Sequence, residues 1–466
     1  MPFTGIEVLP PRFANLKQEI AASYPKFRER ATQAWREVIA ELQEATLEIA
    51  KAGSESIAQV NFADLHKLGE EEIEKIKRQG SVVIKDIVPD AEAIRWKQLL
   101  DEFVKTNPDA EGTPVNDKQF FQLYWTKSQV EARAHPNVLA ACVWLNHLYH
   151  TKDGGVTEAV DLTTPLTYAD RFRIRHPGIG WNDFPPHIDG ECRDQACNYA
   201  TDRCIGGAIE RWEDPIFREC FSSILSGDWR SHDPYELDGR LNASNSRYGR
   251  PNQSSVFRTF QGWLALSEIA PTQGTLRVFP NVYLSNAYII LRPFFRPTVA
   301  AGSAGFLNPE NWELGTHHAV VPGLFLIDPS LDISSSEYPG IYARDGGYTG
   351  PRLTPEVHPH LELEKTMISI PKVHPGDAVF WHCDVIHSVE SEHTGTDDSA
   401  VIYIPAVPLT PINQAYIERQ RETFLKSQRP PDFPKGPGEE AFAGIAGPDD
   451  VVAPIGRRAM GLPISV

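Results

Sequence analysis

Two histidines and one aspartate are the residues of this chain most able to do chemistry. His187 and Asp189 occupy positions i and i+2, and in an extended segment such side chains point the same way. His387 ends a second segment, in which the turn residues Gly376 and Asp377 lead into an apolar strand. Two histidines and a carboxylate can hold Fe(II) on one side and leave positions open for a substrate and oxygen. These residues therefore predict a metal centre and a metalloenzyme.

Other histidines offer alternatives. His382 ends the predicted strand 377–382 and could reach the same ion in place of His387. If His387 is the ligand, we expect His382 behind the ligands or in the pocket. His317 and His318 are adjacent, and neighbours on a strand face opposite ways, so we expect this pair in a loop or on the surface.

Four of the six cysteines lie close together in the sequence and raise the alternative of a zinc site. Their spacings contain no C-x-x-C pair of the kind that structural zinc sites use. Six cysteines in 466 residues do not form a disulfide framework either. We therefore expect free thiols at Cys192, Cys197, Cys204 and Cys220.

Composition limits the partners. The hydrophobic fraction of 41% and the ten tryptophans allow a large core. The formal net charge of −17 is spread along the chain and repels phosphate backbones, so we expect no nucleic-acid partner. The apolar runs, such as 287–291, are too short to span a bilayer, and the first residues do not resemble a secretory leader. These features predict a cytoplasmic protein without a membrane partner.

Short strands following a helical first third must position the metal ligands. The span 13–52 carries a helical stripe of apolar residues, and helices are also predicted over 70–78 and 91–104. In 171–175 apolar and basic residues alternate, which directs Phe172 and Ile174 to the core and the arginines to the other side. Further strands are expected at 82–87, 256–266, 275–279, 319–327, 367–370, 378–381 and 400–404.

This order of elements predicts an α+β fold in which a double-stranded β-helix (jelly roll) is packed against N-terminal helices. The two histidine-bearing segments would lie on neighbouring strands at one mouth of the barrel. We expect a helical extension over 1–69, the jelly-roll domain with insertions over 70–427, and a tail rich in proline and glycine over 428–466.

The metal motif carries a resemblance to a known family. An H-x-D followed by G-D-x-x-x-W and a late histidine resembles the Fe(II)/2-oxoglutarate-dependent dioxygenases, especially the phytanoyl-CoA hydroxylase-like branch. The helix and strand at 76–84 and the glycine-to-proline strand at 274–280 are similar to parts of that fold. The blocks 124–129, 168–171, 210–214 and 257–263 resemble an uncharacterised bacterial and fungal family within this superfamily. Together these motifs cover residues 70–425.

The resemblance implies an enzyme that uses Fe(II), 2-oxoglutarate and O2 to oxidise a small-molecule substrate. Hydroxylation is the usual outcome, and desaturation or cyclisation is open to the same site. The alternative is a cupin-like metal-dependent dioxygenase or isomerase that does not use 2-oxoglutarate. A non-catalytic binding protein is a third class, and the intact set of His187, Asp189 and His387 argues against it.

One departure from the family concerns the far carboxylate of 2-oxoglutarate, which needs a cation. Many relatives place an arginine on the last strand, a little over ten residues after the distal histidine. Residues 397–401 hold no arginine here, and this absence favours the cupin-like alternative. Arg277, Arg258 and Arg173 lie on predicted barrel strands and could bind the carboxylate through two parallel hydrogen bonds. The sequence does not choose among them.

Overall fold

The computed structural model describes residues 9–152, 159–178, 180–181, 184–189, 208–243, 248, 254–315, 335–344 and 347–464. Some expectations fall outside these residues, namely those for Cys192, Cys197, Cys204, the pair His317 and His318, and the predicted strand 319–327. Cys220 is described, and it is a free thiol.

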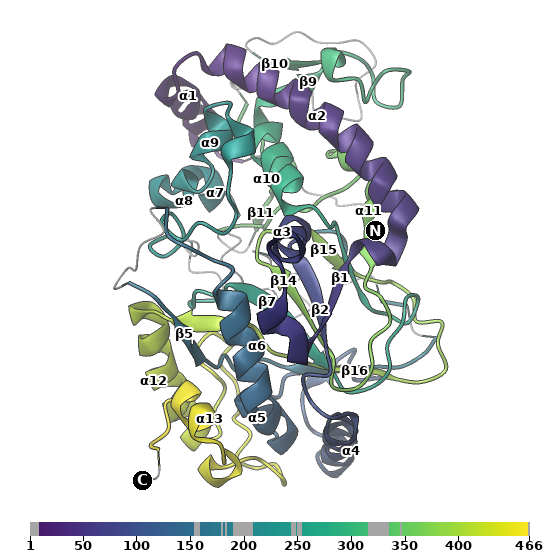
Figure 1. Ribbon diagram of the computed structural model, residues 1–466, viewed down its shortest axis with the longest axis vertical. Helices are drawn as coiled ribbons and strands as arrows, with labels where there is room; N and C mark the ends of the chain where they lie inside the picture. Colours follow the sequence, from purple (N-terminus) through teal and green to yellow (C-terminus); the bar gives the residue numbers. More distant parts are fainter. Residues whose placement is uncertain are drawn as a thin grey trace.

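An eight-stranded sheet runs through the middle of the molecule (Figure 1). Its strand order is β1-β2-β14-β7-β16-β6-β4-β3, and its neighbours pair antiparallel except for β1 with β2. The sheet thus joins strands from both ends of the chain into one scaffold. The strands are β1 Ala58–Asn61, β2 Ser81–Lys85, β3 Gly112–Thr113, β4 Phe120–Phe121, β6 Phe172–Arg175, β7 Phe260–Ala265, β14 Ala378–His382 and β16 Ser399–Tyr403.

A smaller antiparallel sheet packs on one face of the large sheet. Its order is β13-β8-β15, and its strands are β13 Ile368–Ser369, β8 Leu276–Val278 and β15 His387–Val389. Leu276 of this sheet shares one hydrophobic cluster with Trp263 and Val401 of the large sheet. Because successive side chains of a strand alternate between faces, this cluster fills the space between the two sheets.

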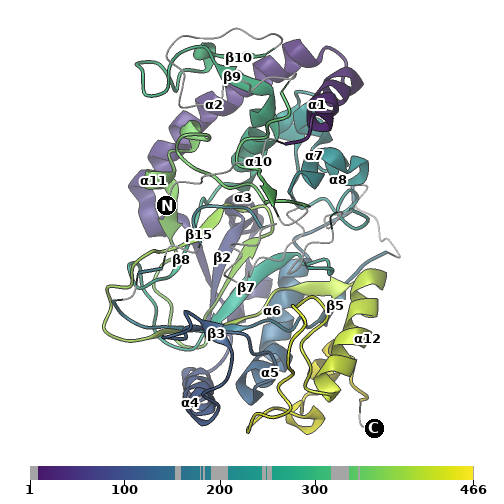
Figure 2. The same ribbon diagram turned by 180° about the vertical axis from the view of Figure 1, so that it is seen from behind.

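The opposite face of the large sheet is covered by helices (Figures 1 and 2). Phe172, Leu264 and Phe380 share a second cluster with Trp96 and Leu145, which come from two of these helices. The alternation predicted for 171–175 is confirmed, because Phe172 lies on the helix-covered face. The helices of this cluster are α3 Glu70–Gln79, α4 Asp90–Thr106, α5 Lys127–Ala134 and α6 Pro136–Asn146.

The helix expected over 13–52 is two helices, α1 Arg12–Ser23 and α2 Phe27–Ala52. The helical conformation is interrupted at Lys26, whose φ of 56° lies in the left-handed region. The predicted apolar stripe of α2 is buried, and Trp35 stacks on Phe295 with ring centroids 4.6 Å apart. In Figures 1 and 2, α2 passes over α10 (Val282–Leu291) at the end of the molecule away from α12.

The C-terminal residues pack against the body of the protein. Helix α12 (Pro411–Leu425) begins at Thr410, whose side chain accepts a hydrogen bond from the backbone N–H of Asn413 at 3.1 Å, as a helix cap does. Glu439 is buried and accepts hydrogen bonds from the backbone N–H groups of Tyr124 and Trp125. The segment predicted to be a tail rich in proline and glycine is thus anchored by a buried carboxyl group.

The remaining elements are short. They are β5 Asp161–Leu166, β9 Phe295–Pro297, β10 Trp312–Leu314, β11 Ala343–Arg344, β12 Gly347–Tyr348, β17 Val407–Leu409, α7 Glu210–Glu213, α8 Pro215–Glu219, α9 Ser222–Leu225, α11 Leu363–Thr366 and α13 Pro454–Ala459. Among the described residues, no helix combines the length and hydrophobicity needed to cross a membrane.

Candidate metal centre

Backbone pairing brings the two histidine-bearing segments together. The N–H of His187 donates to the carbonyl of His387 at 3.0 Å, and the N–H of His387 donates to the carbonyl of His187 at 2.9 Å. Residues that exchange both bonds in an antiparallel pair lie directly opposite each other, with their side chains on the same face. Asp189 lies two residues beyond His187 and so reaches the same side.

The three side chains converge on one buried point. The carboxylate Oδ1 of Asp189 lies 3.1 Å from Nε2 of His387 and 3.6 Å from Nε2 of His187. On each ring the other nitrogen meets a backbone carbonyl: Nδ1 of His187 is 2.6 Å from the oxygen of Pro185, and Nδ1 of His387 is 3.0 Å from that of Val385. A carbonyl can only accept, so each Nδ1 donates to its carbonyl, and Nε2 is the ring nitrogen that faces Asp189.

This arrangement fits a bound cation. Asp189 is fully buried, and neither of its carboxylate oxygens accepts a hydrogen bond from any described residue. A buried carboxylate without hydrogen bonds is costly unless a positive charge offsets it. Two imidazole lone pairs and a carboxylate form the donor set of a facial metal site, and the carbonyls that orient the rings are typical of the outer shell of such sites. The predicted residues His187, Asp189 and His387 can therefore hold one divalent metal ion.

The turn before β14 depends on Gly376 and Asp377. Gly376 has a φ of +91°, and a Cβ atom there would lie 2.0 Å from the carbonyl oxygen of Val88, so a side chain cannot be accommodated. Asp377 accepts hydrogen bonds from the backbone N–H groups of Asp86 at 2.9 Å and His374 at 2.8 Å. These contacts fasten the start of β14 to the end of β2, and β14 leads on to His387.

The alternative ligand His382 lies in a separate buried cluster with Cys383 and Asp384. Asp384 is already paired, at 3.0 Å with Arg211 and at 2.6 Å with Arg240. Burial alone would raise the pKa of Asp384, but the two guanidinium groups hold it well below its usual range. His382 packs flat on Tyr149 and bonds the carbonyl of Pro234, and burial lowers the pKa of His382 to about 3. The two arginines more than balance the charge of Asp384, so this cluster has no need of a metal ion.

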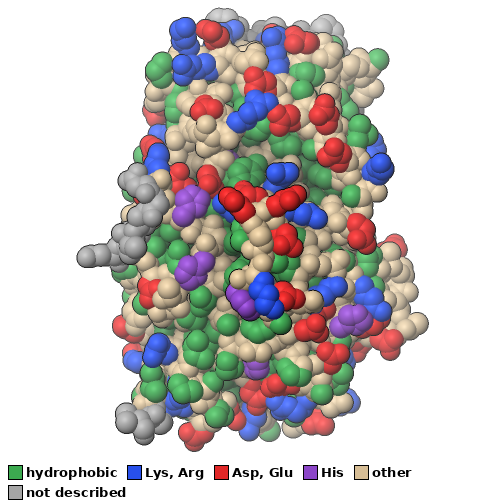
Figure 3. Space-filling view, in the orientation of Figure 1, with side chains coloured by type: hydrophobic (Ala, Val, Ile, Leu, Met, Phe, Trp, Pro, Cys, Tyr) green, Lys and Arg blue, Asp and Glu red, His purple; other side chains and the backbone are tan. Residues whose placement is uncertain are grey.

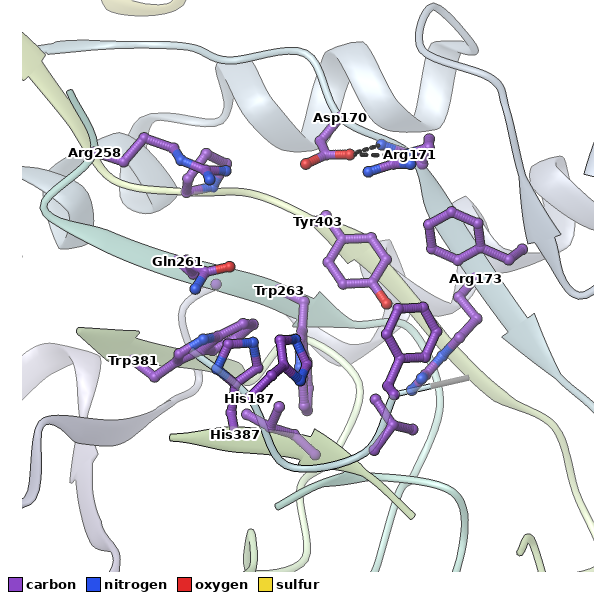
Figure 4. A pocket seen from close by; sticks show the side chains of 16 residues that line it. Asp170, Arg171, Arg173, His187, Arg258, Gln261, Trp263, Trp381, His387 and Tyr403 are labelled. Carbon is purple, nitrogen blue, oxygen red and sulfur yellow. Dashed lines mark hydrogen bonds and ion pairs between the residues drawn. The ribbon is translucent and has the colours of Figure 1, made fainter. Parts of the chain in front are cut away.

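A cavity opens between the two sheets beside His187 and His387 (Figure 4). The space between its lining atoms is about 690 Å³ when the open mouth is included. Apolar walls come from Phe120, Phe184, Trp263, Leu276, Trp381 and Val389, and polar groups come from Asp170, Arg171, Arg173, Arg258, Gln261 and Tyr403.

The cavity gathers positive charge. Among the described residues that line it, three are arginines, and Asp170 offsets one of them through an ion pair of 2.9 Å with Nε of Arg171. On the molecular face in Figure 3, by contrast, acidic and basic side chains are interspersed. An overall acidic protein therefore has a cationic cavity next to its candidate metal ligands, which favours anionic ligands.

Two of the three arginines expected to bind 2-oxoglutarate line this cavity. Arg173 is buried, donates through Nη2 to the carbonyl of Gly274 at 3.2 Å and lies over the Trp181 ring. Arg258 is also buried and lines the cavity. Arg277 is placed elsewhere: its Nε and Nη2 donate to the carbonyl of Met367, and it does not line the cavity. Arg277 alternates with the inward-facing Leu276, which explains its outward direction.

The sequence reasoning missed Gln261 and Trp381 as cavity residues. They are cross-strand partners on β7 and β14, and both line the cavity. A weak signal existed for Trp381, because it belongs to the G-D-x-x-x-W block that carries the resemblance. Gln261 had no local signal other than its period-two position relative to Trp263.

The fold and the three converging side chains define an α+β protein with a candidate metal centre beside a cavity lined by aromatic residues and arginines. This chain belongs to the Gig2-like family, which it matches over residues 7–462.

Three similar proteins cover nearly the whole chain. The crystal structure of GlcNAc Inducible Gene 2, GIG2 (DUF1479), from Candida albicans is 31% identical, with a TM-score of 0.79 over 98% of this chain and 91% of its own. The "Putative Oxidoreductase" from Salmonella typhimurium LT2 is 26% identical, with a TM-score of 0.75 over 99% of this chain and 100% of its own. "Uncharacterized protein YbiU" of Escherichia coli K12 is 29% identical over 435 residues, which are 90% of this chain and 89% of that protein.

Proposed function

We propose that this protein is an Fe(II)- and 2-oxoglutarate-dependent oxygenase that oxidises a small organic molecule. Hydroxylation is the reaction we propose first, and desaturation or cyclisation is open to the same site. The observation that carries the proposal is the convergence of His187, Asp189 and His387, with Asp189 buried and accepting no hydrogen bond from the described residues. The oxidoreductase name of the Salmonella relative agrees with this class of reaction.

The strand order supports a double-stranded β-helix as the fold. The large sheet contains the run β14-β7-β16-β6, and the small sheet continues from β13-β8-β15 to the bridge between His187 and His387. From β6 onward the strands of these two sheets alternate between them along the chain, except that β8 and β13 both lie in the small sheet, and this pattern supports a jelly roll. In this fold the metal ligands lie on two neighbouring strands of the small sheet, at the mouth of the barrel.

Arg173 is the best candidate for the cation that binds the far carboxylate of 2-oxoglutarate. Many Fe(II)/2-oxoglutarate-dependent dioxygenases place an arginine on the last barrel strand, in the stretch that corresponds to residues 397–401 here. Arg173 on β6 is the direct cross-strand partner of Val401 on β16, and its side chain reaches the cavity. The neighbouring strand can thus supply the charge that the last strand lacks, which supports the use of 2-oxoglutarate over the cupin-like alternative.

The residues have distinct roles in the proposed reaction. His187 and His387 would each offer Nε2, and Asp189 a carboxylate oxygen, to Fe(II). The bound iron would couple conversion of 2-oxoglutarate and O2 to succinate and CO2 with transfer of one oxygen atom to a substrate C–H bond. Arg173 would orient 2-oxoglutarate by its far carboxylate. The aromatic walls formed by Phe184 and Trp263 would keep water away from the reacting groups.

The test uses protein reconstituted with Fe(II) without oxygen, then supplied with 2-oxoglutarate and O2. We expect binding of 2-oxoglutarate in equilibrium dialysis and formation of succinate, and both should be lost in Asp189→Ala. Asp109→Ala, a change of the same kind at an exposed position, should behave like the unmodified protein. Failure of the metal-loaded protein to bind 2-oxoglutarate would contradict the proposal.

A further inference from the structure

Gln261 and Trp381 form a pair of buried hydrogen-bond donors inside the cavity. They face each other across β7 and β14 as direct Cα partners, so their side chains lie on the same face of the sheet. Gln261 is 9% exposed and Trp381 is 4% exposed. Nε2 of Gln261 and Nε1 of Trp381 are buried, and neither has a hydrogen-bond partner among the described residues.

Such a pair calls for acceptor atoms. Native proteins satisfy nearly all buried N–H groups with protein, ligand or water acceptors, and here both donors line a cavity that a ligand can enter. Indole nitrogen can only donate, and the amide nitrogen of glutamine only donates as well. The missing partner must therefore bring acceptor oxygens to this wall of the cavity.

The surroundings indicate that the acceptor is negatively charged. Arg258 is buried and lines the same cavity. In Figure 4 Arg258, Gln261 and Trp381 lie on one side of the cavity, and Tyr403 separates them from Arg173. A carboxylate, with two oxygens that accept hydrogen bonds and one negative charge, matches two N–H donors near a guanidinium group.

The far carboxylate of 2-oxoglutarate cannot occupy both ends of this cavity. Trp381 on β14 and Arg173 on β6 are three strands apart, which corresponds to about 14 Å across a sheet. The carbon chain of 2-oxoglutarate spans roughly 5 Å when extended. If Arg173 binds that carboxylate, the donor pair remains available for a second molecule.

We infer that Gln261 and Trp381, together with Arg258, bind a carboxylate group of the primary substrate, which is therefore an organic acid. This inference rests on the proposed function for the role of the bound acid as substrate. The aromatic walls near the pair, including Trp263 and Phe184, suit an apolar body attached to that carboxylate. Recognition of this kind would hold the acid beside His387, whose ring centroid is 5.5 Å from that of Trp381.

The test uses benzoate and benzamide, which have nearly the same shape but differ in charge. Protein loaded with Zn(II), which does not turn over with O2, and with 2-oxoglutarate is titrated with each compound. The indole N–H resonance of Trp381, assigned by its loss in Trp381→Phe, is followed by nuclear magnetic resonance. Benzoate should move this resonance downfield, because the indole proton gains an acceptor, and benzamide should bind at least about tenfold more weakly.

Variants separate the donor pair from the cosubstrate site. Gln261→Glu replaces a donor by a carboxylate of the same size, so it should weaken benzoate binding by about tenfold or more while 2-oxoglutarate binding is retained. Gln59→Glu makes the same change at an exposed position of β1 in the same sheet and should leave both affinities unchanged. Arg173→Met should weaken 2-oxoglutarate and leave benzoate bound, and thermal unfolding of each variant checks that it is folded.

Each outcome decides the inference. It is overturned if benzamide binds as tightly as benzoate, if benzoate does not move the Trp381 resonance, or if benzoate displaces 2-oxoglutarate competitively, since the pair would then serve the cosubstrate. If metal-loaded protein fails to bind 2-oxoglutarate but benzoate still moves the Trp381 resonance, the carboxylate site stands and the proposed function fails. The two proposals can therefore be rejected separately.

Discussion

Arg173 on β6 lies directly opposite Val401 on β16, and the two residues are cross-strand partners in the large sheet. Val401 belongs to the stretch 397–401, in which many of the Fe(II)/2-oxoglutarate-dependent dioxygenases that the metal motif resembles carry an arginine. A guanidinium group on the adjacent strand can reach the same part of the cavity, because directly opposite residues share a face of the sheet. Under the proposed function, Arg173 would supply this cation from the strand next to the last barrel strand.

The first prediction concerns Arg173. Replacing Arg173 by Met should raise the KM for 2-oxoglutarate by about 100-fold, since losing charge-assisted hydrogen bonds costs about 3 kcal/mol. Arg173→Lys should be less severe, because it keeps the charge and loses the paired geometry. Arg277→Met is the matched control, since Arg277 bonds Met367 away from the cavity. An equal effect of the two Met variants on the KM, measured from succinate formation, would contradict the assignment.

The second prediction concerns the charge of Asp189. Without metal, Asp189→Asn should be as stable as the unmodified protein or more stable, because the buried carboxylate accepts no hydrogen bond from the described residues. With a divalent ion at 100 times its Kd, the unmodified protein should gain about 2.7 kcal/mol and the variant much less. Urea unfolding at pH 8 measures the free energy of unfolding of both proteins, with and without Zn(II). The unmodified protein should be the more stable one only when the ion is present. The idea fails if the ion stabilises both proteins equally.

A third prediction links stability to pH through buried histidines. Burial lowers the pKa of His232 to about 4 and that of His360 to about 3, and nearby arginines act in the same direction. In the unfolded chain a histidine has a pKa of about 6.5, so below this pH the unfolded chain binds protons that the buried histidines of the folded protein do not bind. The free energy of unfolding should therefore fall as the pH drops from about 6.5 to about 4, by about 1.4 kcal/mol per unit for each such histidine.

Denaturant unfolding between pH 7 and pH 4 checks this dependence. His360→Gln should lower stability at pH 7, because His360 packs against Trp312 and bonds Tyr288. The same variant should show a shallower loss of stability toward acid. His147→Gln, at an exposed position, should leave the slope unchanged. If the free energy of unfolding falls equally steeply with pH in the His360 variant and in the unmodified protein, His360 does not cause the loss of stability in acid.

The fourth prediction concerns the cluster around Asp384. Asp384→Asn should destabilise the protein by about 3–5 kcal/mol, because it removes the buried carboxylate that pairs with the guanidinium groups of Arg211 and Arg240. Asp238→Asn provides a control on a neighbouring acidic residue at the surface. Differential scanning calorimetry should show a markedly lower Tm for the first variant alone. Metal binding by the folded fraction should be unchanged, since this cluster is separate from Asp189.

Local patterns predicted many of the elements. Period-two alternation gave the faces of Phe172 and Arg173, and apolar residues at helical spacing predicted the buried stripe of α2. The break at Lys26 was not predicted, because its left-handed backbone has no strong signal in a lysine. Anchoring of the C-terminal residues by Glu439 was not predicted either, since it depends on backbone N–H groups more than 300 residues away.

The spacing of residues along the sequence did not decide whether His387 or His382 is the third metal ligand. Both histidines follow the Gly376 turn, and the sequence allowed either to be a ligand. In the structure His387 pairs with His187, whereas His382 lies among Asp384, Tyr149 and the arginines. Strand alternation and the turn between β14 and β15 send the two rings to different clusters.

The sequence by itself determined which residues could hold a metal, because donor type and i, i+2 spacing are local properties. It also determined the strands and helices with strong periodicity. Only the tertiary structure decided that Arg173 stands beside Val401, that Arg277 points away, and that Gln261 meets Trp381. Those relationships come from pairing between strands far apart in the chain, and strand register is set by the whole core rather than by any one segment.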